Sequence, residues 1–266
     1  SHARFMLKKA PEPVTFDSGA SVAESSELTV VDTGRLRASF DRSTGLLRSL
    51  IDLSEDRELL AAAVDLLVVD DQGDCWGGGV HSYRDIVGRF SKAQPATTAR
   101  LAGLDDSESP IPTVRVVENG PVRTVVESLL QYSASTAVER YVFYPDTAYF
   151  EIVLTINWNE PHKMAKFALP TTLSNARTRC EIPYGAIERP SDGQECVGQR
   201  WTTLETGGYM VGLINTGQYG YDAANGELRL SLVRSPVFCH ERHCALEPDR
   251  AHSFMDIGLH EIKLGV

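Results

Sequence analysis

Long apolar runs and basic segments are both missing from this sequence of 266 residues. No apolar stretch approaches the roughly 20 residues that a membrane-spanning helix needs, and no secretory leader pattern opens the chain. Acidic side chains outnumber basic ones, 36 to 26, and the net charge is −10. Because such a surface repels phosphate backbones and anionic lipids, we expect neither nucleic acid nor a membrane as a partner.

Several catalytic signatures are also absent. The sequence has no HExxH zinc motif, no GxSxG nucleophile turn, no P-loop and no GxGxxG turn leading into a helix. Cysteine is scarce and odd in number, with five residues at positions 75, 180, 196, 239 and 244. A disulfide framework is therefore not predicted, and we expect a reducing, cytoplasmic location.

What the sequence does contain is a period of two. Alternate residues are apolar over positions 151–158, and leucine alternates with polar residues over positions 227–232. Turn-forming residues separate such runs, and Asn225-Gly226 between two of them is typical of a β-hairpin. Only residues 55–67 show a helical pattern, and a weak one. The sequence thus predicts an all-β fold, a large antiparallel sandwich.

The ends of the chain suggest a segment of a longer polypeptide. Ser1-His2 resembles the remnant of a removed affinity tag, and residues 8–26 are rich in Pro, Ser and Ala. We therefore expect residues 1–27 to be a tag remnant and linker, and residues 28–266 to form one β-sandwich domain. Within it, the composition of residues 102–112 predicts a long surface loop.

The loop at residues 70–85 is the first candidate for chemistry. It combines acidic groups with aromatic rings and a Gly77-Gly78-Gly79 run. Carboxylates can accept hydrogen bonds from sugar hydroxyls and an indole can stack on a pyranose ring, so we predict carbohydrate contact. The alternative is a tight loop whose tryptophan fills the core. A calcium loop is disfavoured because the central Gly and distal Glu do not fall in register. The candidate substrate-binding residues are Asp74, Trp76, His81 and Tyr83.

Two further clusters carry alternatives. Cys239, His240, His243 and Cys244 lie close together, but structural zinc sites usually pair ligands from two segments and no second half is present. We therefore predict no metal site. Residues 181–190 alternate as a strand pair, in which Arg189 is either a surface ion-pair partner or a weaker candidate for binding a sugar hydroxyl or carboxylate.

Seven stretches, in order along the chain, resemble the C-terminal β-domain of the family 38 glycoside hydrolases, the retaining α-mannosidases. The stretch EIPYGAIERP at residues 181–190, followed by Gln199-Arg200-Trp201, is the most similar. The remaining stretches are residues 41–50, 74–83, 118–123, 157–160 with Lys166, 234–236 and 256–261.

The resemblance implies a large antiparallel β-supersandwich similar to galactose mutarotase. It also implies that zinc and the nucleophilic aspartate belong to a catalytic barrel N-terminal to this region. No catalytic residue and no metal ligand is therefore assigned to this chain. A zinc cofactor is expected only in the catalytic domain of the longer enzyme.

The function expected from the resemblance is that of a non-catalytic domain. It would pack on its own N-terminal catalytic domain, help shape the pocket for an α-mannoside and be inactive alone; an exposed apolar patch could support a homodimer. One alternative is a stand-alone carbohydrate-binding module. A less favoured one is a mutarotase-like epimerase using His162 with Glu160, or His260 with Glu261.

Overall fold

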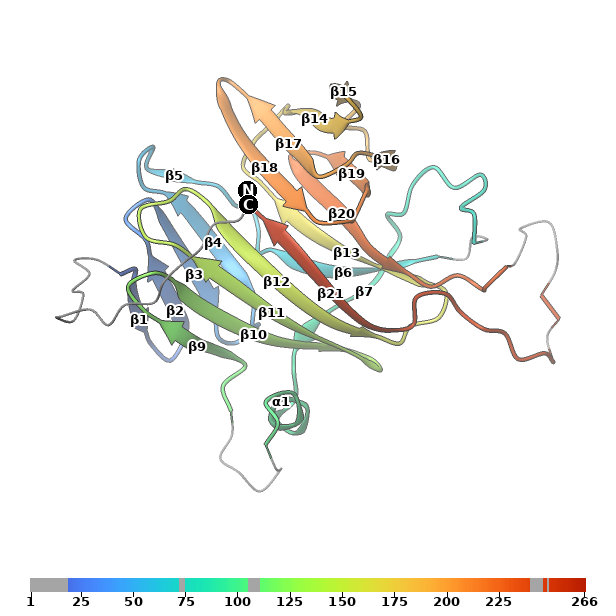
Figure 1. The fold of residues 1–266 in the computed structure, drawn as a ribbon, viewed down its shortest axis with the longest axis horizontal. Coiled ribbons are helices and arrows are strands. Elements are labelled where there is room, and N and C mark those ends of the chain that lie inside the picture. Colours follow the sequence, from blue (N-terminus) through green and yellow to red (C-terminus); the bar gives the residue numbers. More distant parts are fainter. Residues whose placement is uncertain (1–18, 72–74, 105–110, 240–245, 248) are drawn as a thin grey trace, which may run out of the picture.

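The computed structural model describes residues 19–71, 75–104, 111–239, 246–247 and 249–266. Its strands pair in antiparallel fashion in three sheets (Figure 1), which confirms the predicted all-β antiparallel class. Within the described part of the chain, no helix has both the length and the apolar composition needed to cross a membrane.

The first sheet has five strands in sequence order, a meander of short hairpins. Its strands are β1 (Ser21–Glu24), β2 (Leu28–Asp32), β3 (Leu36–Asp41), β4 (Leu47–Asp52) and β5 (Arg57–Glu58). Strand β1 lies within the range predicted to be linker, and neighbouring Ala20 is buried in the core. Its pairing with β2 supplies backbone hydrogen bonds that composition alone does not reveal.

The second sheet has ten strands, and its central strand is the last one of the chain. Strand β21 lies between β12 and β18, so it joins two groups of hairpins. In spatial order the strands are β15 (Gly185–Arg189), β14 (Arg177–Ile182), β17 (Trp201–Thr206), β18 (Tyr209–Asn215), β21 (Gly258–Gly265), β12 (Phe150–Trp158), β11 (Ser135–Phe143), β10 (Thr124–Tyr132) and β8 (Ser91–Lys92), with β9 (Val114–Asn119) also paired to β10.

The third sheet has six strands and carries the candidate site described below. In spatial order these are β16 (Cys196–Val197), β19 (Gly220–Ala224), β20 (Glu227–Arg234), β13 (Lys163–Pro170), β6 (Asp65–Asp70) and β7 (Ile86–Arg89).

One hydrophobic cluster contains side chains from all three sheets. The ring of Phe40 on β3 packs edge-on against Tyr141 on β11, with the ring centroids 4.9 Å apart. Trp158 on β12 is fully buried, and its indole N–H donates to the Ser235 hydroxyl at 2.8 Å. Burying one large apolar side chain contributes on the order of 2–3 kcal/mol, so this shared core holds the sheets together.

The helix expected at residues 55–67 is not formed. Strand β5 and the start of β6 lie at residues 57–58 and 65–67 of that range, and Leu59, Leu60 and Val64 belong to the hydrophobic core. A continuous apolar run that is buried on both faces, as in β6, has no alternation that would mark it as a strand. The described helix is instead α1 (Pro95–Leu101), which has proline in its first turn.

The predicted hairpin at Asn225-Gly226 is confirmed between β19 and β20. Both turn residues have positive φ, 53° and 79°, as a two-residue type I′ turn requires. A Cβ atom added at Gly226 would lie 2.6 Å from the Leu173 carbonyl oxygen. Substitution there meets both backbone strain and a steric clash.

We expect Gly226→Ala to lower the free energy of unfolding by about 1–3 kcal/mol, as measured by urea denaturation. Gly217→Ala is the matched control, because an added Cβ there meets nothing within 4 Å. Equal stability of the two variants would contradict the expectation.

Candidate functional site

The loop between β6 and β7 packs, through Tyr83 and Arg84, against the face of the six-stranded sheet that is turned away from the core. On β13, Phe167 belongs to the core cluster, so neighbouring Lys166 points to the opposite face. On β19, Tyr221 likewise belongs to the core cluster, and its neighbour Asp222 points to the opposite face. Lys166 and Asp222 are nevertheless 0% exposed, because the loop and the segment before β16 cover them.

Lys166 and Asp222 form the centre of an ionic cluster. The Lys166 ammonium donates to Asp222 Oδ2 at 2.7 Å and to Glu195 Oε2 at 2.5 Å. The Ser231 hydroxyl on β20 donates to the other oxygen of Glu195 at 2.6 Å. Arg84, from the loop, pairs with the Oδ1 atom of Asp222. Buried charges are tolerated when each is paired and hydrogen-bonded in this way.

Hydrogen bonds hold the loop against the segment before β16 and against β20. The Ser82 hydroxyl donates to the Gly193 carbonyl at 3.1 Å, and the Glu195 N–H donates to the His81 carbonyl at 2.9 Å. At the start of the loop, Arg234 on β20 donates to both oxygens of Asp71, at 2.7 and 3.0 Å. The loop is therefore fastened close to both of its ends.

The four loop residues predicted to bind sugar occupy different environments. Trp76 is 79% exposed and His81 is also exposed. Tyr83 is buried beneath the loop with Val69 and Met164, and the guanidinium of Arg234 lies 5.3 Å from its ring centroid. Asp74 lies outside the described residues. Trp76 and His81 are thus presented to solvent, whereas Tyr83 supports the loop from below.

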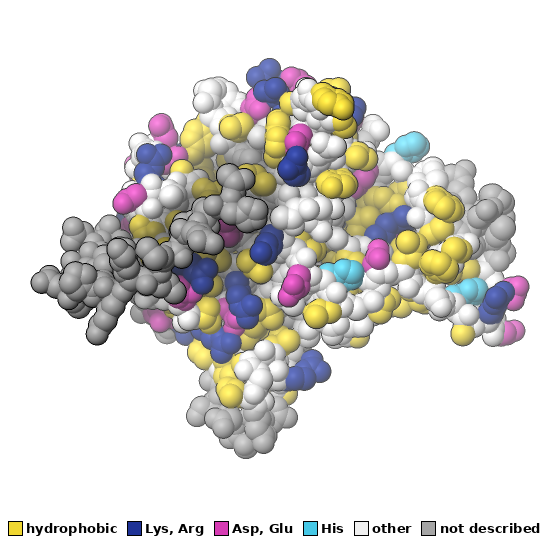
Figure 2. Space-filling model, in the orientation of Figure 1, with side chains coloured by type: hydrophobic (Ala, Val, Ile, Leu, Met, Phe, Trp, Pro, Cys, Tyr) yellow, Lys and Arg dark blue, Asp and Glu magenta, His cyan; other side chains and the backbone are white. Residues whose placement is uncertain are grey.

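Arg189, the fifth predicted residue, lies on another element, the β14–β15 hairpin. The side chain is half-buried, and its Nε atom is buried without a hydrogen-bond partner among the residues that the structure describes. Tyr184 at the tip of this hairpin is fully exposed and has a positive φ of 66°. Figure 2 shows hydrophobic side chains on the surface at the top of the view, where β14 and β15 lie in Figure 1.

The residue pairs nominated for epimerase chemistry serve other contacts. Glu160 accepts hydrogen bonds from the Ala134 N–H at 3.0 Å and the Ser135 hydroxyl at 2.9 Å. The His162 ring packs edge-on against Phe254, with the ring centroids 5.0 Å apart. His260 and Glu261 are neighbours on β21, where successive side chains point to opposite faces.

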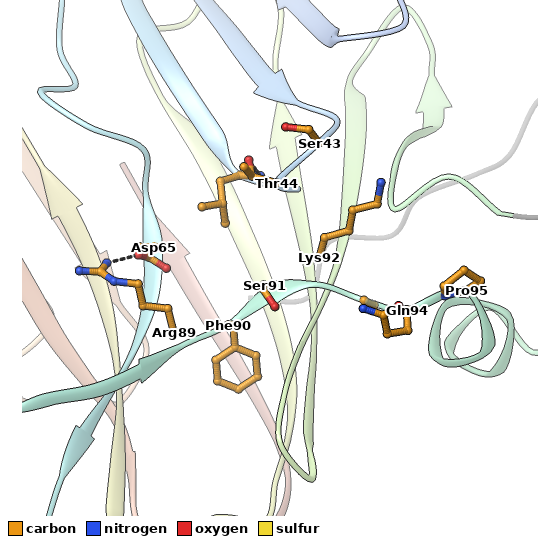
Figure 3. Close-up of a pocket in the computed structure, with 11 residues that line it drawn as sticks. Ser43, Thr44, Asp65, Arg89, Phe90, Ser91, Lys92, Gln94 and Pro95 are labelled. Atoms are coloured by element: carbon orange, nitrogen blue, oxygen red, sulfur yellow. Dashed lines mark hydrogen bonds and ion pairs between the residues drawn. The ribbon is translucent and has the colours of Figure 1, made fainter.

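A separate hollow of about 660 Å³ lies beside the turn between β3 and β4. In Figure 3, Ser43 and Thr44 on that turn lie across the hollow from the segment that carries Ser91 and Lys92. Asp65 lines it and pairs with Arg89, while burial raises the pKa of the Asp65 carboxyl group. None of the residues that line this hollow belongs to the loop that carries Trp76.

Within the described residues, no group of three or more His, Cys, Asp and Glu side chains is placed to hold a metal ion. The cysteine–histidine cluster at residues 239–244 lies outside the described residues except for Cys239. Among the described residues, Cys180, Cys196 and Cys239 are free thiols.

Sequence reasoning missed the ionic cluster. In the sequence, Lys166 draws attention through the family resemblance, whereas Arg84, Glu195 and Asp222 have no pattern that marks them as partners. One signal was available: Lys166 stands in a run of apolar residues on β13, where an isolated charge needs a buried partner.

Comparison with known proteins places the chain in a family. The model for the glycosyl hydrolases family 38 C-terminal domain matches residues 31–250. Alpha-mannosidase G of Dictyostelium discoideum is 28% identical over 211 residues, which are 73% of this chain and 18% of that protein. This chain therefore spans less than a fifth of the length of that relative.

A solved structure with a TM-score above 0.5 supports the fold. A family 38 glycosyl hydrolase from Enterococcus faecalis superposes with a TM-score of 0.65 at 12% identity, covering 89% of this chain and 29% of that chain. A galactose mutarotase-like protein from Lactobacillus casei superposes with a TM-score of 0.41 at 10% identity, covering 92% of this chain and 98% of that chain. The family match extends over most of the sequence, and the chain belongs to the glycosyl hydrolase family 38 C-terminal domain family.

Proposed function

We propose that this chain is the non-catalytic C-terminal part of a longer α-mannosidase-like retaining glycosidase. It packs against the catalytic domain and contributes the loop at residues 75–85 to the wall of the sugar pocket. The zinc ion that the family resemblance implies belongs to the catalytic domain, and no catalytic step is assigned to this chain. A reducing, cytoplasmic location remains part of the proposal.

The observation that carries this proposal is the exposed Trp76 on a fastened loop. Its side chain is 79% exposed, although tryptophan side chains are mostly buried in folded proteins. The contacts of Ser82, Arg84 and Arg234 hold the surrounding loop against a sheet. A rigid support for an aromatic ring lowers the entropy lost on binding, which suits stacking on the apolar face of a pyranose.

An assay of α-mannoside hydrolysis tests whether the catalytic groups lie outside this chain. We expect the 266-residue chain to leave a chromogenic α-mannoside intact in the presence of zinc, and a protein extended to include the upstream region to hydrolyse it. Turnover by the 266-residue chain at a comparable rate would place the catalytic groups within it and reject the proposal.

The role of Trp76 can be tested in the extended enzyme. We expect Trp76→Ala to lower kcat/KM for an α-mannoside by on the order of tenfold, mainly through KM, because a stacking contact is lost. Val122→Ala is the control, since Val122 is 61% exposed in the turn between β9 and β10. If the two variants have equal kcat/KM values, the loop does not contact substrate.

The same exposed indole favours a second candidate, a module that binds glycans without its catalytic domain. Titration calorimetry of the 266-residue chain with mannose oligosaccharides separates the two. Saturable heat that disappears in Trp76→Ala supports the module, whereas no heat together with an active extended enzyme supports the accessory domain.

A further inference from the structure

The ionic cluster under the loop has an uneven charge distribution. Lys166 on β13, Asp222 on β19 and Glu195 in the segment before β16 together carry one positive and two negative charges. We call these three residues the socket. Without Arg84 the charges of the socket sum to −1, while Lys166 and Asp222 are 0% exposed beneath the docked loop. A net buried charge is costly in such surroundings.

Arg84 supplies the missing positive charge. Its guanidinium pairs with Asp222 Oδ1, while Lys166 takes Oδ2, so each carboxylate oxygen has a cationic partner. Arg84 itself is 27% exposed, so it joins the socket from the solvent side. With the loop in place the four side chains are neutral in sum and both Asp222 oxygens are satisfied.

The segment opposite leaves room for this side chain. A Cβ atom added at Gly193 would lie 3.0 Å from Arg84 Cδ and 3.3 Å from its Nε and Nη1 atoms. Gly193 also has a positive φ of 82°, a conformation that glycine adopts without strain. A side chain at position 193 would therefore require the Arg84 side chain to shift, in addition to the backbone strain.

We infer that Arg84 is the positioning residue of this loop. By entering the socket of Lys166, Asp222 and Glu195, it sets where the loop lies on the sheet, and so where Trp76 is presented. The consequence for sugar binding rests on the proposed function, but the position of the loop does not.

Hydrogen exchange of the 266-residue chain tests the inference directly. The amide of Glu195 donates to the His81 carbonyl, so it is protected only while the loop is docked. We expect Arg84→Met to speed exchange of the Glu195 amide by roughly 10- to 100-fold, because local opening becomes easier. Amides of β11 and β12 should keep their protection, and Arg84→Lys should restore part of it at Glu195.

A control and a second variant keep the test decisive. Arg123→Met removes an arginine from an exposed ion pair with Glu118 and should leave Glu195 exchange unchanged. Gly193→Ala keeps Arg84 but crowds its side chain, and it should also speed exchange at Glu195. If Glu195 exchanges at the wild-type rate in both Arg84→Met and Gly193→Ala, the inference is wrong.

The two proposals fail separately. Faster exchange in Arg84→Met, together with an unaffected kcat/KM in Trp76→Ala, would retain Arg84 as the positioning residue and reject the sugar contact. Unchanged exchange with a reduced kcat/KM in Trp76→Ala would retain the sugar contact and reject the role of Arg84.

Discussion

Replacing Asp222 by alanine is expected to lower the free energy of unfolding by about 3–5 kcal/mol. The substitution leaves the Lys166 ammonium with Glu195 alone and deprives Arg84 of its carboxylate partner. Because Lys166 is 0% exposed, water cannot replace the lost partner. Urea denaturation monitored by circular dichroism at neutral pH measures the change.

Two further variants serve as controls for the effect of Asp222→Ala on stability. Asp222→Asn keeps the shape and one of the two hydrogen-bond acceptors but removes the charge, so its loss of stability should be smaller than that of Asp222→Ala. Glu118→Ala, from an exposed ion pair with Arg123, should leave the denaturation midpoint almost unchanged. If Asp222→Ala is as stable as Glu118→Ala, the cluster does not contribute to folding.

The stability of the chain is expected to rise as the pH falls from 8 to 5, and Glu139 is the cause. Burial of Glu139 on β11, together with a smaller contribution from the nearby Asp65 on β6, raises the pKa of its carboxyl group from 4.5 to about 7. The hydroxyl of Tyr141 donates to Glu139 at 2.9 Å and opposes the rise in the pKa. Asp65 is itself paired with Arg89.

The direction of this pH dependence follows from how tightly the folded and unfolded states bind the Glu139 proton. Since the folded state binds the proton more tightly, the contribution of Glu139 is fully present below pH 4.5 and is lost as the pH rises through about 7. The difference in pKa corresponds to about 3 kcal/mol. Glu139→Gln should therefore raise the free energy of unfolding at pH 8 by up to about that amount.

Denaturation of the wild type and Glu139→Gln at several pH values between 5 and 8 measures this effect. The difference between the two proteins should grow with pH over that range. Glu118→Gln, at an exposed carboxylate, is the control and should follow the wild type. A difference that stays constant with pH would show that Glu139 does not titrate in this range.

Much of the fold follows from local patterns in the sequence. Strands β12 and β20 have an apolar face and a polar one over much of their length, so their period of two is visible. The turn at Asn225-Gly226 has residues that tolerate positive φ. Strand β6 was not recognised, because it is buried on both faces and carries no alternation. Short strands such as β1 depend on backbone pairing with a neighbour, which composition does not encode.

The candidate site was predicted only in its exposed part. The aromatic and glycine-rich composition of the loop drew attention to Trp76, whereas the partners that hold the loop come from distant strands. Lys166, Glu195 and Asp222 meet because β13, β19 and the segment before β16 are brought together by the sheet order. That order is a property of the whole topology, and no local spacing in the sequence reveals it.

The central position of β21 also determines when the ten-stranded sheet can be completed during synthesis. The hairpins β10–β11–β12 and β14–β15–β17–β18 each form from contacts close in sequence. Their junction must wait for residues 258–265, which pair with residues 151–158 synthesised much earlier. Pairing across such a separation is slow. Until residues 258–265 leave the ribosome, β12 and β18 present open strand edges, which favour aggregation of the nascent chain.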